Sequence, residues 1–260
     1  MPWRPRCARH WISDADVSPS GALQLTVKQQ QFNAAMARFN RGRGYVGFGW
    51  LVATVNISLQ LYLLVNVWPL GVGPLQQGLV LIVAWFVTDF VNGLIHMVMD
   101  NYDDYESLVG PLIANFHLHH KIPQYRKNPL PVVYFLESGA KVWLIGYLSL
   151  VALALPLLQS TPFLAWLLVY VGIFSCVAEV SHYLCHSSMS PLACRLGNYG
   201  ILLGKRHHAR HHLHNNVSYA FLNGLTDPLI DPIARRLYPG YKFTTDFHFA
   251  AYTPPDLERR

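Results

Sequence analysis

The stretch QGLVLIVAWFVTDFVNGLIHMVM, residues 77–99, combines the two features that decide the architecture of this chain. It is almost continuously apolar, and as an α-helix it is long enough to cross the hydrocarbon core of a bilayer, which is about 30 Å thick. It also carries Asp89 and, near its end, His96. Ionisable groups inside an apolar span are costly and are usually functional or paired. The stretch therefore predicts a transmembrane helix that brings a histidine to one edge of the membrane.

Three further apolar stretches have similar length. They lie at residues 45–68, 140–158 and 163–185, and short segments join the four stretches into two hairpins. Of the 260 residues, 52% are hydrophobic and 13% are charged, and this charged fraction is about half that of an ordinary soluble domain. We therefore predict an all-α integral membrane protein with four transmembrane helices. The alternative is four buried helices in a large soluble bundle.

The basic residues predict the orientation of these spans. All 20 Lys and Arg lie before the first span, between the two hairpins as far as Lys141, or after the fourth span, and neither hairpin tip carries one. Cytosolic segments of membrane proteins are enriched in Lys and Arg, so we expect both termini and the central segment in the cytosol. We interpret the net charge of +6 mainly as this orientation signal and expect no nucleic-acid partner.

This topology divides the chain into three parts. We expect a cytosolic N-terminal segment over residues 1–44, a membrane domain over 45–240, and a peripheral or mobile tail over 241–260. Within the membrane domain, residues 100–139 and 187–240 form a cytosolic helical cap. Residues 1–44 lack the compact apolar core of a secretory signal. The four cysteines show no CxxC pairing, so we expect no disulfide framework; they are Cys7, Cys176, Cys185 and Cys194.

Eleven of the 13 histidines fall in the predicted cytosolic layer. They are His96 and the histidines of FHLHHK (116–121), SHYLCH (181–186) and HHARHHLH (207–214). Neutral imidazole is a common metal ligand, and so many histidines in one layer exceed what packing needs. The sequence therefore predicts a metal site there. The isolated His10 and His248 are expected to be ordinary surface residues.

The spacing of the histidines suits helices that serve two metals. Residues four apart share one helix face, so His207 with His211, and His208 with His212, form two adjacent stripes on one helix. A single zinc site needs only three or four ligands. Ten or so histidines therefore indicate two metal ions.

Two acids lie deeper in the predicted spans. Asp89 precedes His96, and Glu179 precedes His186, by seven residues, which is about 10 Å along a helix. One interpretation is that each acid accepts a hydrogen bond from a ring N–H and so fixes a metal ligand. The other is that each acid is protonated or paired with a neighbouring helix.

The histidine groups resemble those of membrane fatty acyl desaturases and hydroxylases, and most closely the lipid desaturase family. That family includes animal plasmanylethanolamine (Kua-like) desaturase, a bacterial carotenoid regulator and a plastid phosphatidylglycerol desaturase. The segments that carry the resemblance are DFVNGLIHMVMDNY (89–102), FHLHHKIP (116–123), SHYLCH (181–186), GKRHHARHH (204–212) and NNVSYAFLNG (215–224).

The resemblance implies ten metal ligands or close neighbours of the metals: His96, Asp100, His119, His120, His182, His186, His207, His208, His211 and His212. Five further residues are candidates for supporting positions around them: Asp89, Glu179, His117, His214 and Asn216. Of these, His117 and His214 fall where the family pattern has no histidine. Glu179 and Asn216 also depart from the animal enzymes, which leaves the substrate open.

The function implied is that of an O2-dependent desaturase with two iron ions, acting on a lipid acyl or alkyl chain. The chain has no Gly-rich dinucleotide motif and no CxxCH haem motif, so we expect an external electron donor, a ferredoxin or small cytochrome with its reductase. Two alternatives stay open. One is a lipid hydroxylase with the same metal centre, and the other is a histidine-rich metal transporter or sensor.

Overall fold

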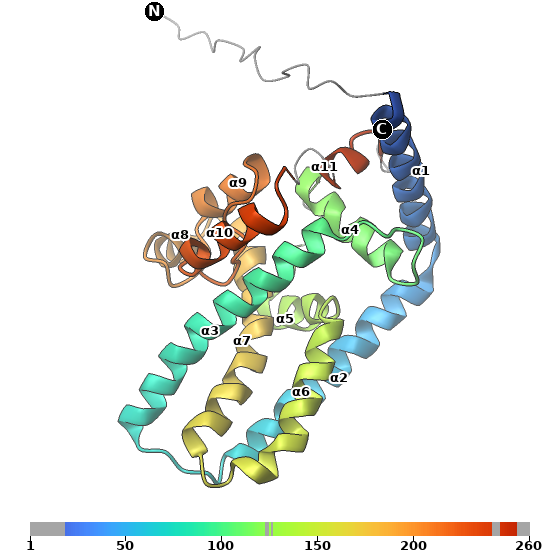
Figure 1. The fold of residues 1–260 in the computed structure, drawn as a ribbon. Helices are drawn as coiled ribbons and strands as arrows, with labels where there is room; N and C mark the ends of the chain where they lie inside the picture. The colour runs from blue at the N-terminus through green and yellow to red at the C-terminus, as the bar shows by residue number, and fades with distance from the viewer. Residues whose placement is uncertain (1–18, 123–124, 126, 241–244, 254–260) are drawn as a thin grey trace, which may run out of the picture.

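A computed structural model describes residues 19–122, 125, 127–240 and 245–253. Every regular element in these residues is a helix. Figure 1 shows long helices running side by side, with most of the shorter helices gathered at one end. In chain order the elements are α1 (Pro19–Arg41), α2 (Arg43–Val67), α3 (Pro74–Asn101), α4 (Gly110–Lys121), α5 (Leu130–Ser138), α6 (Val142–Ala154), the 3-10 helix η1 (Leu155–Leu158), α7 (Pro162–Ser187), α8 (Pro191–Asn198), α9 (Lys205–Leu213), α10 (Asp227–Leu237) and α11 (Thr245–His248).

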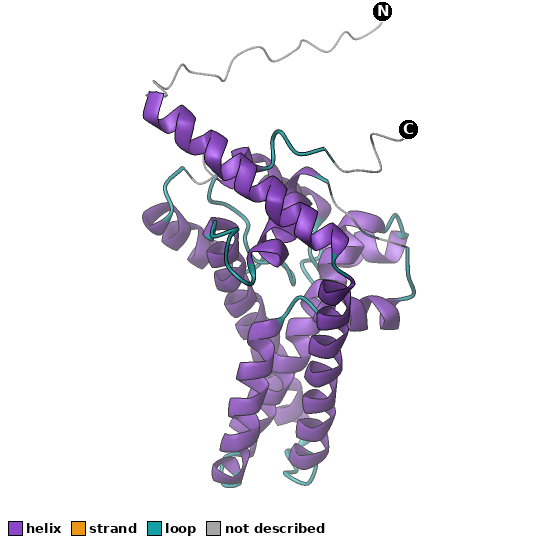
Figure 2. Ribbon diagram, turned by 90° about the vertical axis from the view of Figure 1, so that its right-hand side faces the viewer, coloured by secondary structure: helices purple, strands orange, loops and turns teal. Residues whose placement is uncertain are grey.

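Three of these helices, α2, α3 and α7, are long and apolar enough to cross a membrane, judged by length and composition. They have 25, 28 and 26 residues and confirm the helices predicted over 45–68, 77–99 and 163–185. The connections at residues 68–73 and 159–161 lie at the end of the bundle opposite α4 and α8 to α11 (Figures 1 and 2). The apolar core of this end includes Leu63, Val80, Leu148 and Val169, which are fully buried.

The third predicted span, over 140–158, is helical from Val142 to Leu158, but its last turn is a 3-10 helix. The α-helix α6 begins at Val142 and gives way at Leu155 to η1. Pro156 explains this end, because proline lacks an N–H and clashes with the carbonyl one turn before it. Upstream, α5 precedes α6 and is bent by 88° from it, and the two together are apolar enough for one broken span.

The break between α5 and α6 is stabilised by a buried amide from α2. Asn56 is fully buried, and its Nδ2 donates to the carbonyls of Ser138 and Lys141, each at 3.1 Å. Gly139 is needed here for a different reason. A Cβ on Gly139 would stand 2.5 Å from the carbonyl oxygen of Gly49, so no larger residue fits without moving α2.

The expectation that the C-terminal tail is peripheral is wrong for residues 245–253. Phe249 and Tyr252 are buried against Phe32 of α1, with ring centroids 6.1 and 5.7 Å from it. The Nζ of Lys121 donates to the carbonyls of Phe249, Ala250 and Tyr252. The tail therefore forms one hydrophobic core together with α1 and α4.

Among the described cysteines, Cys176, Cys185 and Cys194 are free thiols. Cys7 and His10 lie outside the described residues.

Replacing Asn56 by leucine is expected to destabilise the protein, because it removes the two buried hydrogen bonds that join α2 to the carbonyls of Ser138 and Lys141. The net contribution of one such hydrogen bond is about 0.5–1.5 kcal/mol. Thermal unfolding in detergent should show a clear fall in midpoint. The matched control is Asn66→Leu, an exposed amide of the same helix that bonds only to its own turn. Equal midpoints for the two variants would contradict this account of the break.

Candidate metal centre

Eight of the ten predicted ligands form two groups in which one ligand atom from each residue lies within 4.8 Å of the others. The first, here called the Asp100 group, contains His96, Asp100, His120 and His211. The second, the His208 group, contains His119, His186, His208 and His212. Helices α4 and α9 contribute to both, and the rings of His120 and His212 have centroids 5.1 Å apart. The two groups therefore adjoin.

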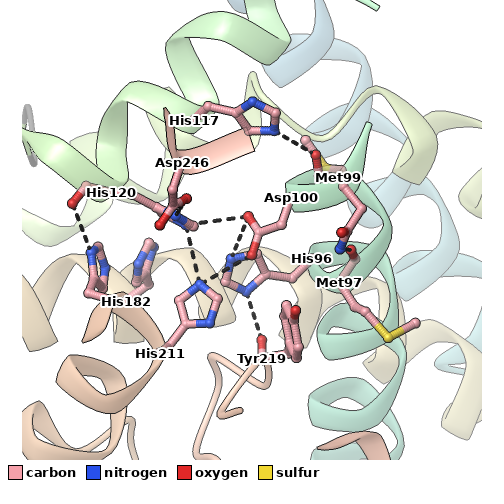
Figure 3. A network of polar contacts seen from close by, with 12 residues as sticks. His96, Met97, Met99, Asp100, His117, His120, His182, His211, Tyr219 and Asp246 are labelled. Atoms are coloured by element: carbon pink, nitrogen blue, oxygen red, sulfur yellow. Dashed lines mark hydrogen bonds and ion pairs between the residues drawn. The ribbon is translucent and has the colours of Figure 1, made fainter. Parts of the chain in front are cut away.

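In the Asp100 group three imidazoles surround one carboxylate, as Figure 3 shows. The Nε2 atoms of His96, His120 and His211 lie 3.5, 3.3 and 3.3 Å from the Asp100 oxygens. The side chains of Asp100 and His211 have no exposed surface. Water is therefore excluded from the point where the four side chains meet.

The opposite nitrogens of these rings show which tautomer each ring adopts. The Nδ1 of His96 lies 2.7 Å from the carbonyl of Tyr219, and the Nδ1 of His211 lies 3.2 Å from the carbonyl of Val217. A carbonyl oxygen only accepts, so in each ring Nδ1 carries the hydrogen and donates it. A neutral imidazole carries only one N–H hydrogen. Its Nε2 therefore has a free lone pair, which is directed at Asp100.

This arrangement fits a metal ion. The Nε2 lone pairs and the carboxylate oxygens of Asp100 can only accept hydrogen bonds, so they repel one another. Both Asp100 oxygens are buried without a hydrogen bond. Burial, the largest effect, and the nearby His96 hold the pKa of His211 well below its usual value, so its ring is neutral. A cation between the four side chains removes the repulsion, and Nε2 ligands fixed through Nδ1 are the usual form of a histidine metal site.

The His208 group also consists of imidazole nitrogens that face one another. The Nε2 atoms of His119 and His186 are buried and make no hydrogen bond. The Nε2 of His208 lies 2.9 Å from the Nε2 of His212 and also 2.9 Å from the Nε2 of His182. Burial and neighbouring imidazoles keep the pKa of His119 and His208 well below its usual value, so these rings are neutral and able to bind a metal.

His182 lies beside the His208 group without being one of its four members. Its Nε2 is directed at His208, while its Nδ1 lies 2.9 Å from the hydroxyl of Tyr125. The structure therefore brings His182 to the centre. Tyr125 was missed by the sequence analysis, since a tyrosine in a connecting loop carries no local signal for this role.

His207 is the one predicted ligand that the structure turns away from the centre, which corrects its assignment. Its Nε2 pairs with a carboxylate oxygen of Asp227 at the start of α10. Its ring packs on Gly224, where a Cβ would stand 2.6 Å from Nε2. Of the two predicted stripes on α9, His208 and His212 lie in the same group. In the other stripe, His211 belongs to the Asp100 group and His207 belongs to neither group.

Asp89 holds a loop rather than a histidine. Its carboxylate accepts hydrogen bonds from the backbone N–H groups of Leu222, Asn223, Gly224 and Thr226 and from the Thr226 hydroxyl. These bonds account for a fully buried carboxylate inside α3. They also dock the segment that follows α9 onto α3, and that segment supplies the Tyr219 carbonyl to His96.

Glu179 also has a partner other than the one predicted. Its Oε1 lies 2.9 Å from the Nζ of Lys141, and its Oε2 lies 3.9 Å from the Nδ1 of His182. It is therefore next to His182 rather than His186. Lys141 is buried, donates to Asn92 at 2.7 Å and lies over the ring of Phe221, so its ammonium is paired inside the bundle.

The other three supporting candidates, Asn216, His214 and His117, have different surroundings. Asn216 is buried, donates to the carbonyl of Tyr238 and accepts from the hydroxyl of Tyr219, so it braces the residue that holds His96. His214 is exposed, at the end of α9, and belongs to neither group.

The third, His117, is buried and faces away from both groups. Its Nε2 donates to the carbonyl of Met99, and its Nδ1 lies 2.8 Å from the hydroxyl of Tyr105. The same hydroxyl lies 3.0 Å from the Nδ1 of His248. His248 is 5% exposed, so the expectation that it is a surface residue is wrong.

A cavity of about 330 Å³ adjoins both groups, a volume within the range of small-molecule sites. His96, His119 and His182 form part of its wall. Most of the remaining wall is apolar and includes Phe39, Ile95, Met99, Phe116, Trp143 and Phe221, while Glu137, Lys141 and Glu179 form a polar part. The cavity can therefore receive an apolar chain beside the histidines.

The fold and the site define a helical protein with three or four candidate membrane spans and two histidine-rich groups that can hold metal ions. A family model described as a lipid desaturase domain matches residues 85–237. The match covers more than half of the 260 residues, and the chain belongs to the lipid desaturase family. Membership supports a membrane location, an oxidoreductase activity of the lipid desaturase type and the use of metal. No curated protein matches the chain, and no solved structure does.

Acidification is expected to weaken the fold through His248. Burial, the largest effect, lowers the pKa of His248 to about 4. Among the charges that face it, Asp103 and Asp246 raise this pKa while His117 and Lys28 lower it. An unfolded histidine has a pKa of about 6.5, so between these values the unfolded state binds more protons. Stability should therefore fall as the pH is lowered from about 6.5 to 4.

Urea unfolding of the metal-free protein across this range measures the effect. His248→Gln should reduce the dependence on pH, because it removes one of the buried rings that titrate in this range. The control His214→Gln removes an exposed imidazole and should keep the slope of the parent protein. A slope unchanged by His248→Gln would refute the assignment.

Proposed function

We propose that this protein is a membrane-bound, O2-dependent di-iron desaturase that introduces a double bond into a lipid acyl or alkyl chain. The observation that carries the proposal is the Asp100 group, in which fixed imidazole lone pairs surround a buried carboxylate. A second group of four imidazoles adjoins it. Two adjacent sites suit the activation of dioxygen better than one isolated structural site.

Nine residues would hold the metals: His96, Asp100, His119, His120, His182, His186, His208, His211 and His212. All are nitrogen or oxygen ligands, and the two groups contain no cysteine among the described residues. Such ligands suit iron, zinc and copper, whereas thiolate-rich sites suit other chemistry. Iron is proposed because desaturation needs a redox-active metal, which excludes zinc.

The proposed reaction removes two hydrogens from adjacent carbons of the chain. One O2, two electrons and two protons enter, and two molecules of water leave with the alkene. When bound, the two iron ions supply the oxidising power that an unactivated C–H bond requires and that no side chain provides. The electrons would come from an external donor, a ferredoxin or small cytochrome with its reductase.

The part of the protein itself is to bind the chain and keep water out. The cavity presents apolar side chains next to His96, His119 and His182, which supports the binding of an apolar chain at the metals. Phe221 packs against His96 and His182, with ring centroids 5.3 and 5.6 Å away, and so shields both rings from water.

We also propose a topology with four spans, in which α5 with α6 and η1 counts as one broken span. Both hairpin tips then lie outside the cytosol, and the histidines and both termini lie in the cytosol. The absence of Lys and Arg from residues 68–73 and 159–161 supports this orientation.

Lipid analysis of cells with and without the gene tests the reaction. The product should differ from its precursor by the loss of two hydrogens. His208→Ala and His211→Ala should each reduce it to background, since each removes a buried ring from one group. His214→Ala, in the same segment but exposed, should leave product formation within about twofold of the parent protein.

Three results would contradict the proposed desaturase. A product that gains one oxygen without losing hydrogen would identify a hydroxylase. Stoichiometric zinc without iron in the purified protein would remove the redox centre. Metal uptake into vesicles that depends on the protein would favour the transporter.

Cysteine labelling tests the orientation. In a background without native cysteines, Ser160→Cys in the turn before α7 should react with a membrane-impermeant thiol reagent in intact cells. Leu213→Cys in α9, at a position that is 74% exposed, should react only after permeabilisation. The reverse pattern would invert the topology.

A further inference from the structure

The segment that follows the matched domain reaches the Asp100 group. The family match ends at residue 237, and α11 begins at Thr245. Helix α11 packs on α1 and α4, and the chain after it is held by Lys121, whose Nζ donates to three of its carbonyls. Two anchors, aromatic packing on Phe32 and the bonds from Lys121, thus fix the segment over the end of α4.

One side chain of this segment contacts a candidate ligand. Asp246 Oδ1 lies 3.1 Å from the Nδ1 of His120, while the Nε2 of the same ring lies 3.3 Å from Asp100. His120 is therefore placed between two carboxylates (Figure 3). Its side chain is 3% exposed, and that of Asp246 is 19% exposed, so the contact is shielded from most solvent.

Asp246 occupies the same position as two backbone carbonyls do for the other rings of the group. The carbonyls of Tyr219 and Val217 accept from the Nδ1 of His96 and His211. Both lie within the matched domain. Only His120, the third ring of the group, has a carboxylate at Nδ1. A carboxylate accepts a stronger hydrogen bond than a neutral carbonyl and makes the opposite nitrogen a better ligand.

We propose that Asp246 is a positioning residue that fixes the tautomer and orientation of His120, so that residues outside the matched domain complete the Asp100 group. The inference rests on the proposed function in one respect, namely that the Asp100 group binds a metal. Asp246 acts through His120 and is not itself a ligand. The ion pair of Asp246 is with His120, a member of the Asp100 group and not of the His208 group.

Anaerobic titration of the full-length, metal-free protein with Fe(II), followed by near-infrared circular dichroism, tests the proposal. The parent protein should bind two Fe(II) with distinct spectra. Asp246→Ala should weaken one of the two sites by about 10- to 100-fold, the range for loss of a carboxylate behind a metal-bound histidine, and should leave the other unchanged. Asp246→Asn keeps the size and an acceptor oxygen, and should weaken the same site less.

The control is Asn40→Ala, which removes the hydrogen bond from Asn40 to the Tyr252 hydroxyl and leaves Asp246 in place. It should bind both Fe(II) as the parent does. Two intact sites in both Asp246 variants would overturn the inference, and so would equal weakening in Asn40→Ala, because the effect would then come from packing. A parent protein that binds no Fe(II) would instead refute the proposed function.

Discussion

The burial of Asp100 among three imidazoles is the constraint on which the rest of this structure depends. The carboxylate has no exposed surface and no hydrogen-bond donor of its own, and an unpaired charge in such a place is strongly destabilising. The ligands that surround it come from α3, α4 and α9. A cation bound between these helices would compensate the buried carboxylate, which links the fold to the proposed metal.

Other buried polar groups in the apolar helices connect the parts of the protein that create this site. Asp89 accepts five hydrogen bonds from the loop at residues 222–226, and the same loop region carries the carbonyl that fixes His96. Asn56 holds the break that leads into α6, and that break places Lys141 beside Glu179. Asp89 and Asn56 thus have partners from other elements, and these contacts bring the Tyr219 carbonyl to His96 and Lys141 to the wall of the cavity.

The sequence alone accounted for much of the centre. Family membership was confirmed, the helices around 45–68, 77–99 and 163–185 were confirmed, and eight of the ten predicted ligands come together in two groups. These features are local. An apolar run of fixed length reports a span, and a spacing of four residues places His208 and His212 on one face. The resemblance supplied Asp100 by its position one turn after His96.

The remaining features were settled by contacts between distant segments, which no spacing encodes. His207 shares its helix face with His211, yet its ring is directed away from the metal groups. It packs on Gly224 and pairs with Asp227 at the start of α10. Asp246 is 126 residues from His120 in the chain, and His248 lies in a segment that looks like a tail until Phe32 and Lys121 bind it. The sequence determined which residues are able to hold metal and on which helices they lie. Only the tertiary structure decided how they divide into two groups and which second atoms hold each ring, because a ring's orientation is set by the partner of its other nitrogen.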